Sequence, residues 1–304
     1  MPDALEVVST GPLALIQDLG RTGYARLGVG RSGSFDRASH RLAQALVGNH
    51  DGAAGFEVAL GGLSVRSDAD MMVAVTGAPV EIRVGGTPVD QGAQFLVPSG
   101  ELLSLGRCAS GVRSYVAVAG GLAVQPTLGS RSTDVLSGLG PPLVRGGDVV
   151  PIGTPDGDQT LQSAASRSRA EGAAGIQCRA HPDGGHGTDR PAVIGVIAGP
   201  RDDWFVPAAL ETLRDSTYTV DPASNRVGVR LQGPTLTRTS DRELPSEPTL
   251  PGAIQVPPNG LPLILGPDGP VTGGYPVIAV VVEDDLDVLA QLRPGDPLRF
   301  RRFR

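Results

Sequence analysis

The sequence predicts a mainly β protein, built from two β domains with a few short helices. Glycine and proline, 43 and 27 residues, make up almost a quarter of the 304-residue chain, which leaves little room for long helices. Short β-branched or alternating segments recur between Gly/Pro turns, a pattern typical of sandwiches and barrels. Several short motifs also appear twice, in the same order in each half.

The expected strands follow one another with turn residues between them. In the first half they are LEVVS, GLSVRS, MMVAVTG, VEIRVGG, QFLVPSG, LLSLG and RSYVAVAGG; in the second they are AVIGVIAGP, TYTV, GVRLQG, AIQVP, LPLILG, YPVIAVVVE and LRFRRF. Apolar residues at helical spacing predict a helix over residues 34–47, ended by Gly48. The segments EDDLDVLAQL and DDWFVPAALETL predict two more helices.

The repeated motifs indicate a duplication. Four motifs of the first half are similar to motifs of the second half: VSTGP to VIAGP, RLGV to RVGV, VPSGELLSLG to VPPNGLPLILG, and VRGGDVVPI to LRPGDPLRF. Tyr115 and Tyr275 stand at corresponding positions after the third pair. We therefore expect two related β domains, residues 1–153 and 191–304, joined by a polar, low-complexity linker at 154–190.

Composition excludes several function classes. All 26 basic residues are arginine, so Schiff-base chemistry and a P-loop lysine are ruled out, and arginine forks or backbone amides must recognise phosphate or carboxylate. The net charge is −6 and the arginines are scattered, which argues against a nucleic-acid surface. Two cysteines without motif spacing, no basic leader and no apolar run of 18 residues predict a cytoplasmic protein without membrane spans. The four histidines show no metal-site spacing, so no metal is expected.

The string GVGRSG, residues 28–33, matches the G-x-G-x-x-G fingerprint of dinucleotide-binding proteins. That fingerprint requires a strand running directly into the first glycine and a helix after the last. The preceding residues QDLGRTGYARL contain no buried strand, and no α/β alternation follows. We interpret the string as a turn that leads into the helix over 34–47.

Polar residues crowd around these turns: Asp18, Arg21, Arg26, Ser32 and Asp36. Loops on a rigid β scaffold often carry sites, but turn formation and helix capping explain the same residues, with Ser34 or Asp36 as the N-cap. The turn GSRSTD, residues 129–134, suits an oxyanion or phosphate, and a capping turn is equally consistent.

Together the motifs resemble a known family. IQDLGRTGY, SGSFDRAS, FEVALGG, VTGAPV, RSYVAVAGGL, LGSRSTD, SNRVGVRL, GAIQVPPNGLPLIL and TGGYPVIAVV are similar to the signature blocks of the family of the 5-oxoprolinase C-subunit. The family is also called allophanate hydrolase subunit 2 or biotin-dependent carboxyltransferase-like, and it includes the sporulation kinase-inhibitor antagonist. The blocks run from about residue 11 to residue 300.

The resemblance implies two cyclophilin-like β-barrel domains and a protein that does not act alone. It implies a B-subunit partner (allophanate hydrolase subunit 1-like) and a LamB/YcsF-like A-subunit, which together with this chain open 5-oxoproline to glutamate using ATP and Mg²⁺. ATP would phosphorylate the amide oxygen, and water would attack the activated carbon. Arginines and hydrogen-bond donors would stabilise the developing charge.

Matching the motif blocks residue by residue, the resemblance implies two groups of site residues. The catalytic candidates are Asp36, Glu57, Arg131, Asp268 and Tyr275. The candidates for substrate or phosphate binding are Asp18, Arg21, Arg113, Tyr115, Arg226, Arg230 and Gln255.

Two departures from the family pattern leave other functions open. Asn225 stands where an aspartate is usual, and Pro270 stands where a glutamine is usual. One alternative is a regulatory antagonist that binds a kinase-inhibitor-like protein related to the B-subunit. Another is the carboxyltransferase module of a urea carboxylase/allophanate hydrolase-type system. Biotin would then arrive on another chain, because this one has no lysine to carry it.

Overall fold

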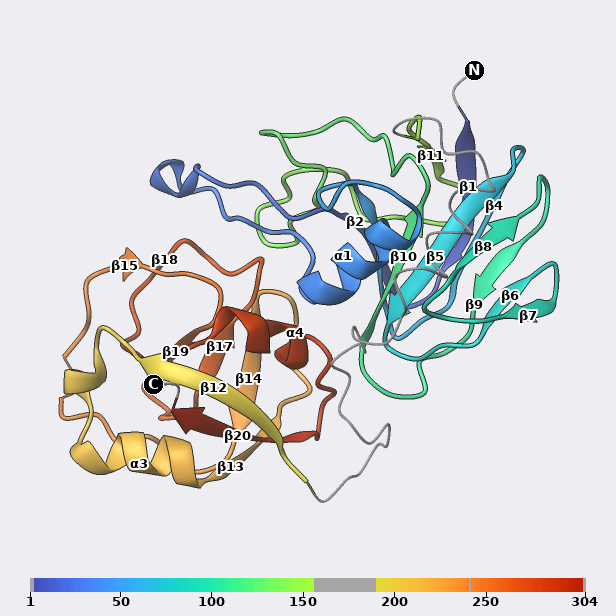
Figure 1. Cartoon of the computed structure of the whole chain (residues 1–304). Coiled ribbons are helices and arrows are strands. Elements are labelled where there is room, and N and C mark those ends of the chain that lie inside the picture. Colours follow the sequence, from blue (N-terminus) through green and yellow to red (C-terminus); the bar gives the residue numbers. More distant parts are fainter. Residues whose placement is uncertain (1–2, 156–189, 241, 303–304) are drawn as a thin grey trace. The chain divides into compact units, whose positions relative to one another are not determined.

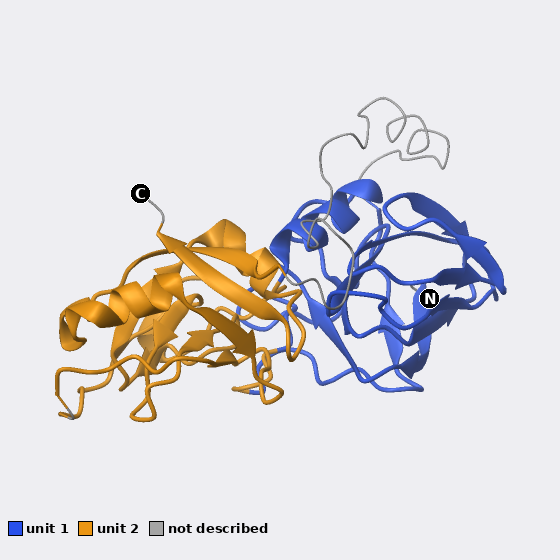
Figure 2. Cartoon of the chain, turned by 90° about the horizontal axis from the view of Figure 1, so that it is seen from below, with its two compact units in different colours: residues 1–21, 36–133, 138–182 blue, residues 22–35, 134–137, 183–304 orange. Residues whose placement is uncertain are grey.

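The computed structural model describes residues 3–155, 190–240 and 242–302. The chain divides into two compact units (Figure 2). Unit 1 comprises Met1–Arg21, Asp36–Thr133 and Gly138–Pro182, and unit 2 comprises Thr22–Phe35, Asp134–Ser137 and Asp183–Arg304. The segments 22–35 and 134–137 therefore group with the second half of the chain. Most of the expected linker, and with it Cys178, His181 and His186, lies outside the described residues.

Unit 1 is built from two antiparallel sheets (Figure 1). The six-stranded sheet has the order β11 (Val149–Pro151), β1 (Ala4–Thr10), β4 (Leu63–Ser67), β9 (Leu103–Leu105), β6 (Ile82–Val84), β7 (Thr87–Val89). The five-stranded sheet has the order β2 (Leu13–Gln17), β3 (Gly55–Ala59), β10 (Arg113–Val118), β5 (Met71–Gly77), β8 (Gln94–Val97). Residues of both sheets share one apolar core, as in a sandwich.

Strand β10 is buried on both faces. Val116 and Val118 point into the core between the sheets, whereas Tyr115 and Ala117 pack against helix α1 (Arg37–Leu46). Because strand side chains alternate between faces, the run RSYVAV can be continuously buried only where a helix covers the outer face.

Helix α1 begins three residues later than predicted. Asp36 is its N-cap, with extended backbone angles, and its carboxylate accepts hydrogen bonds from the amide N and the Oγ of Ser39, at 2.9 and 2.7 Å. The capping carboxylate satisfies an amide that the first turn leaves unpaired, so the helix starts after Asp36 and residues 34–36 lie outside it.

Unit 2 contains a closed barrel with the strand order β12 (Ala192–Ala198), β19 (Val277–Val281), β16 (Ala253–Gln255), β17 (Leu263–Leu265), β14 (Gly228–Gln232), β13 (Thr217–Val220), β20 (Pro297–Arg302). The β12–β20 pair, which closes the ring, is parallel and the others are antiparallel. Strands β15 (Glu247–Pro248) and β18 (Thr272–Gly273) pair separately. Helix α3 (Pro207–Asp215) packs against β20 (Figure 1).

The mainly β fold class is confirmed. The helix expected in DDWFVPAALETL is present as a 3₁₀ turn, η2 (Asp202–Trp204), followed by α3; EDDLDVLAQL forms η3 (Glu283–Asp285) and the single turn α4 (Leu286–Leu289). A further 3₁₀ turn, η1 (Ala25–Leu27), precedes GVGRSG. Among the described residues, no helix is long and apolar enough to cross a bilayer.

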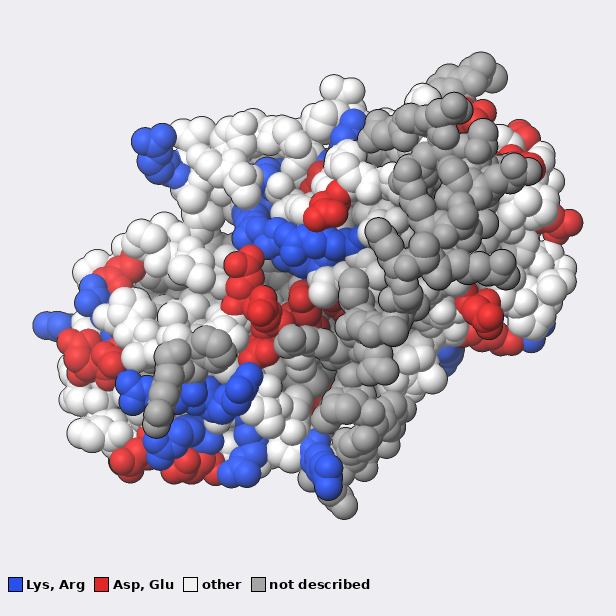
Figure 3. Space-filling model, viewed as in Figure 1, with Lys and Arg blue, Asp and Glu red and all other residues white. Residues whose placement is uncertain are grey.

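Charged side chains of both signs are mixed over unit 2 on the face in Figure 3. The ion pairs of unit 2 include Arg214 with Asp215, which is exposed, and Arg201 with Glu247, which is partly buried. On that face the arginines gather in groups that lie beside acidic side chains.

Candidate functional site

Nine of the twelve sequence-predicted site residues have buried side chains. Arg131 is partly buried, and Arg230 and Tyr275 are exposed. The structure distributes the twelve residues over four separate groups, two in each unit. One group surrounds a pocket that contains three of them, Arg230, Gln255 and Tyr275.

The first group, in unit 1, is centred on Asp18. Its carboxylate accepts hydrogen bonds from the amide N of Gly20 (2.7 Å) and of Arg131 (2.6 Å). It also accepts from the hydroxyls of Ser130 (2.7 Å) and Ser132 (2.5 Å). Three of these donors bond Oδ1 and one bonds Oδ2, so Asp18 holds the turn GSRS in place.

Arg21 secures the same turn from the other side. Its guanidinium donates to the carbonyl oxygens of Thr127 and Ser132, while Nη1 is buried without a hydrogen-bond partner among the described residues. The side chain of Arg131 leaves this group: its Nε donates to the carbonyl of Val124 at 2.7 Å, and the residue lines a different cavity of unit 1.

The second group surrounds Tyr115, between β10 and α1. The Tyr115 hydroxyl donates to Glu57 Oε2 (2.9 Å) and accepts from the Asp36 amide (2.8 Å). Arg113 Nε lies 3.4 Å from Glu57 Oε1. Burial, reinforced by the neighbouring carboxylates of Glu57 and Asp36, raises the pKa of Tyr115 well above its ordinary value.

The Tyr115 hydroxyl therefore stays protonated and acts as a hydrogen-bond donor. The ring of His40 packs edge-on against it, with centroids 6.1 Å apart. Burial is the largest influence on the His40 imidazole and lowers its pKa to about 4, although Asp18 and Glu57 oppose the shift. Asp36 is the N-cap of α1, as one interpretation of the sequence predicted. The hydrogen bonds of this group connect α1 to the sheet.

The third group, in unit 2, is a buried ion pair. Arg226 donates from Nε and Nη2 to the two carboxylate oxygens of Asp268, at 2.8 and 2.9 Å, and both side chains are at most 3% exposed. Asp268 also accepts from Ser32 Oγ (2.7 Å) and the Val135 amide (3.2 Å), and Arg226 donates to the Gly33 carbonyl (2.6 Å). This pair therefore binds the segments 22–35 and 134–137 to the barrel.

The fourth group forms what we call the Gln255 pocket, a cavity of about 280 Å³ in unit 2. Strand register builds it. Arg230 on β14 pairs with Leu263 on β17, and Leu263 pairs with Gln255 on β16. The alternate residues of these strands, Val229, Ile264 and Ile254, belong to the barrel core, so Arg230, Leu263 and Gln255 lie side by side on the outer face.

The segment 270–275 covers this outer face and contributes the remaining wall. Gly273 lies so close to Gln255 that an added Cβ would come within 2.3 Å of the Gln255 Nε2. The same Nε2 donates to the Tyr275 carbonyl at 3.4 Å. The full lining is Asn225, Val227, Gly228, Arg230, Gln255, Leu263, Leu265, Pro270, Gly273, Gly274 and Tyr275.

Asn225 enters the pocket on an Asx turn. Its side-chain oxygen accepts from the amides of Val227 (2.8 Å) and Gly228 (3.2 Å), a role that an aspartate oxygen would fill equally well. The difference from the family's aspartate lies in the other side-chain atom, which is an NH₂ donor where an aspartate has a second negatively charged oxygen.

The Gln255 pocket is rich in hydrogen-bond donors. Arg230 supplies a positive charge, Asn225 and Gln255 supply amides, and Tyr275 supplies a hydroxyl, whereas none of the described lining residues is Asp or Glu. Such a set favours carboxylates and carbonyl oxygens. Gly273 and Gly274 also line the pocket and were not predicted as site residues, although the adjacent glycines of TGGYP were the available signal.

Unit 2 is thus a β barrel with a small, donor-lined pocket on its outer face. The chain matches the family described as carboxyltransferase domain, subdomain A and B, over residues 27–302. The chain belongs to this family.

The proteins that the chain resembles include a 5-oxoprolinase subunit and urea-metabolising enzymes. The chain is 38% identical to the C-subunit of 5-oxoprolinase from Escherichia coli, covering 97% of this chain and 90% of that protein. It is 33% identical to the urea amidolyase of Lachancea kluyveri over 98% of this chain but only 17% of that protein. The crystal structure of Kluyveromyces lactis urea carboxylase superposes with a TM-score of 0.86 at 30% identity, covering all of this chain and 28% of that one.

Proposed function

We propose that the chain is a non-autonomous subunit of an ATP-dependent amide hydrolase of the 5-oxoprolinase type. In the complete complex, 5-oxoproline, ATP and water would give glutamate, ADP and phosphate. The observation that carries the proposal is the donor-rich Gln255 pocket in a chain whose similarity to a 5-oxoprolinase C-subunit covers nearly its whole length. We further propose that both units are cyclophilin-like and that the protein works in the cytoplasm.

The pocket residues suit a cyclic amide that carries a carboxylate. Arg230 would pair with the carboxylate, and the amide groups of Asn225 and Gln255 would donate to the lactam carbonyl. Donors fixed toward that oxygen stabilise the negative charge it gains when the carbon is attacked. Tyr275, 43% exposed, would close the open side over the bound ring.

The lining also indicates what this pocket lacks among the described residues. The described lining residues include no carboxylate, so the pocket offers no Asp or Glu as a general base and no anionic oxygen ligand for Mg²⁺. This lining does not favour Mg–ATP in the Gln255 pocket, and we propose that the nucleotide and the proton-transfer groups belong to the B-subunit-like and LamB/YcsF-like partners. This division of labour is why we propose one component of a complex and not a complete enzyme.

Reconstitution tests the proposal. The chain is co-expressed with its B-subunit-like and LamB/YcsF-like partners, and 5-oxoproline-dependent ADP release is measured. Arg230→Gln should raise KM for 5-oxoproline by about ten- to a hundredfold, the loss of a charge-assisted contact of about 1.5–3 kcal/mol. Arg145→Gln, an exposed arginine of unit 1, is the matched control. Absence of ADP release in every combination of these proteins contradicts the proposal.

A carboxyltransferase role is the second candidate, because solved relatives include a urea carboxylase. Urea is neutral, so Arg230→Gln should then leave KM for urea nearly unchanged. The assay is transfer of labelled carboxylate from a carboxybiotinyl protein to urea. The third candidate, a regulatory antagonist, predicts tight binding to a kinase inhibitor that resembles the B-subunit, without turnover of either substrate.

A further inference from the structure

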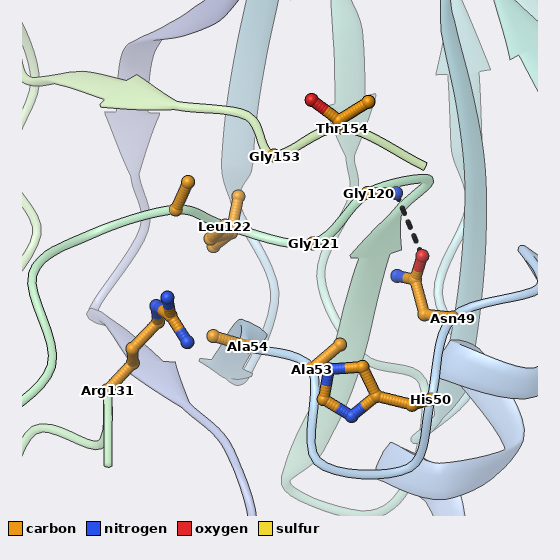
Figure 4. A pocket seen from close by; sticks show the side chains of 11 residues that line it. Asn49, His50, Ala53, Ala54, Gly120, Gly121, Leu122, Arg131, Gly153 and Thr154 are labelled. Atoms are coloured by element: carbon orange, nitrogen blue, oxygen red, sulfur yellow. Dashed lines mark hydrogen bonds between the residues drawn. The ribbon is translucent and has the colours of Figure 1, made fainter. Parts of the chain in front are cut away.

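Unit 1 contains a second cavity, of about 190 Å³, that the proposed function does not use. Figure 4 shows it between Arg131 on one side and His50 on the other, with the glycine turns at 120–121 and 153 along its wall. Among its described lining residues are no carboxylates. The two ionisable side chains in the wall are thus an arginine and a histidine.

The guanidinium of Arg131 is held in place at two points. Its backbone amide donates to the buried Asp18 carboxylate at 2.6 Å, and its Nε donates to the Val124 carbonyl at 2.7 Å. Neither Nη group has a hydrogen-bond partner among the described residues. The two Nη groups are therefore held in a fixed position, and a ligand that binds them does not have to order the side chain.

The wall of the cavity is equally fixed. A Cβ added to Gly120 would lie 2.0 Å from the carbonyl oxygen of Gly153, so the two backbones are in direct contact. Asn49 clamps the turn by accepting from the Gly120 amide and donating to Gln44 Oε1 and the Val118 carbonyl, all within 2.8 Å. The cavity cannot collapse onto Arg131 without breaking these contacts.

We propose that the Arg131–His50 cavity binds a phosphate-class oxyanion, either free phosphate or the phosphoryl end of a larger molecule. Two Nη donors match two oxygens of an oxyanion. A third donor, from the imidazole on the opposite side, suits a tetrahedral anion whose oxygens point in several directions, whereas a planar carboxylate would use the guanidinium alone. The volume is below that of drug-sized pockets, about 300–1,000 Å³, and so suits one small group.

This inference does not rest on the proposed function, and the isolated chain suffices to test it. His50 is one of four histidines, so its ring resonances can be followed by NMR on histidine-labelled protein and assigned with His50→Gln. Inorganic phosphate is titrated at constant ionic strength. The His50 resonance should move and saturate, while that of the buried His40, which does not line the cavity, should move less.

Arg131→Gln should weaken phosphate binding by about tenfold or more, and Arg145→Gln should leave it unchanged. Because Arg131 anchors a loop, His50→Gln serves as a second variant: it retains every hydrogen bond of Arg131 and should still weaken binding, followed by phosphorus line broadening. ADP binding more tightly than phosphate, with the same dependence on Arg131, identifies a nucleotide's phosphoryl end as the source.

Three results overturn the proposal. One is a His50 resonance that does not respond to phosphate. Another is a response that survives Arg131→Gln undiminished. The last is saturation by acetate at the same concentration as by phosphate, which would show that the cavity does not select a tetrahedral anion.

Discussion

Replacing Asp268 with asparagine should strongly destabilise unit 2. The Asp268 side chain is fully buried and is bonded to Arg226, itself 3% exposed. The substitution removes the negative charge but leaves the guanidinium buried. Breaking a buried pair on one side costs about 3–5 kcal/mol, and here the same carboxylate also accepts from Ser32 and Val135. We expect the free energy of unfolding to fall by about that amount.

Urea unfolding followed by tryptophan fluorescence measures this loss directly. The chain has a single tryptophan, Trp204, which lies in unit 2 beside its core, so the signal reports on that unit. A lower midpoint at unchanged slope would show a change in stability and not in the denatured state. Asp215→Asn, which removes a carboxylate from an exposed pair with Arg214, is the matched control and should not move the midpoint measurably.

A double substitution shows whether a loss of stability comes from the uncompensated buried charge or from the lost hydrogen bonds. If the uncompensated charge is the cause, Arg226→Met combined with Asp268→Leu should recover part of the stability, because no buried charge remains, although Ser32, Val135 and Gly33 still lose their bonds to the pair. A loss below about 1 kcal/mol for Asp268→Asn, the range of exposed pairs, would refute the reasoning.

Three further predictions concern other described residues. Burial lowers the pKa of His40 from 6.5 to about 4, so its contribution to stability is complete above pH 6.5 and is lost as the pH falls toward 4, by about 3 kcal/mol. In urea unfolding followed by circular dichroism, His40→Gln should reduce the pH dependence of the free energy of unfolding. The same pH dependence in the variant and the wild type would contradict this. Tyr115→Phe removes one hydrogen bond to the buried Glu57 carboxylate and one from the Asp36 amide and should cost about 1–3 kcal/mol in the same assay; an unchanged midpoint would show those bonds to be dispensable. Gly273→Ala should displace Gln255 and reduce kcat/KM in the reconstituted complex, whereas Gly274→Ala, whose added Cβ meets its nearest atom at 3.4 Å, should not; equal effects would remove the steric argument.

Much of the fold was predictable from local pattern. The alternation of apolar residues and the Gly/Pro turns placed most strands, because they report directly on sheet faces and chain reversals. The start of α1 was harder to place, since Ser34 and Asp36 both suit an N-cap. Only the backbone geometry decides between them, and it selects Asp36.

The Gln255 pocket could be predicted only in part. Gln255 and Tyr275 were found through their motifs, but the pocket depends on register: Arg230, Leu263 and Gln255 come from three strands and meet in one row. Register between strands distant in sequence is set by the whole barrel and leaves no local signal. For the same reason the sequence could not show that Asp268 is bonded to Arg226 inside unit 2, whereas Arg230 and Gln255 line a pocket.

The string GVGRSG shows how position decides the meaning of a motif. In a dinucleotide fingerprint the amides after the glycines point at a pyrophosphate. Here the amide of Ser32 donates to the Pro267 carbonyl, and its hydroxyl donates to Asp268. The carbonyl of Gly33 accepts from Arg226. These groups are consumed within unit 2, so the glycines serve the turn: Gly28 and Gly33 have φ of 77° and 93°, values that other residues rarely adopt. The string therefore anchors a segment of the first half of the chain to the barrel of the second, and a nucleotide could bind along it only by breaking the contacts of the Arg226–Asp268 pair.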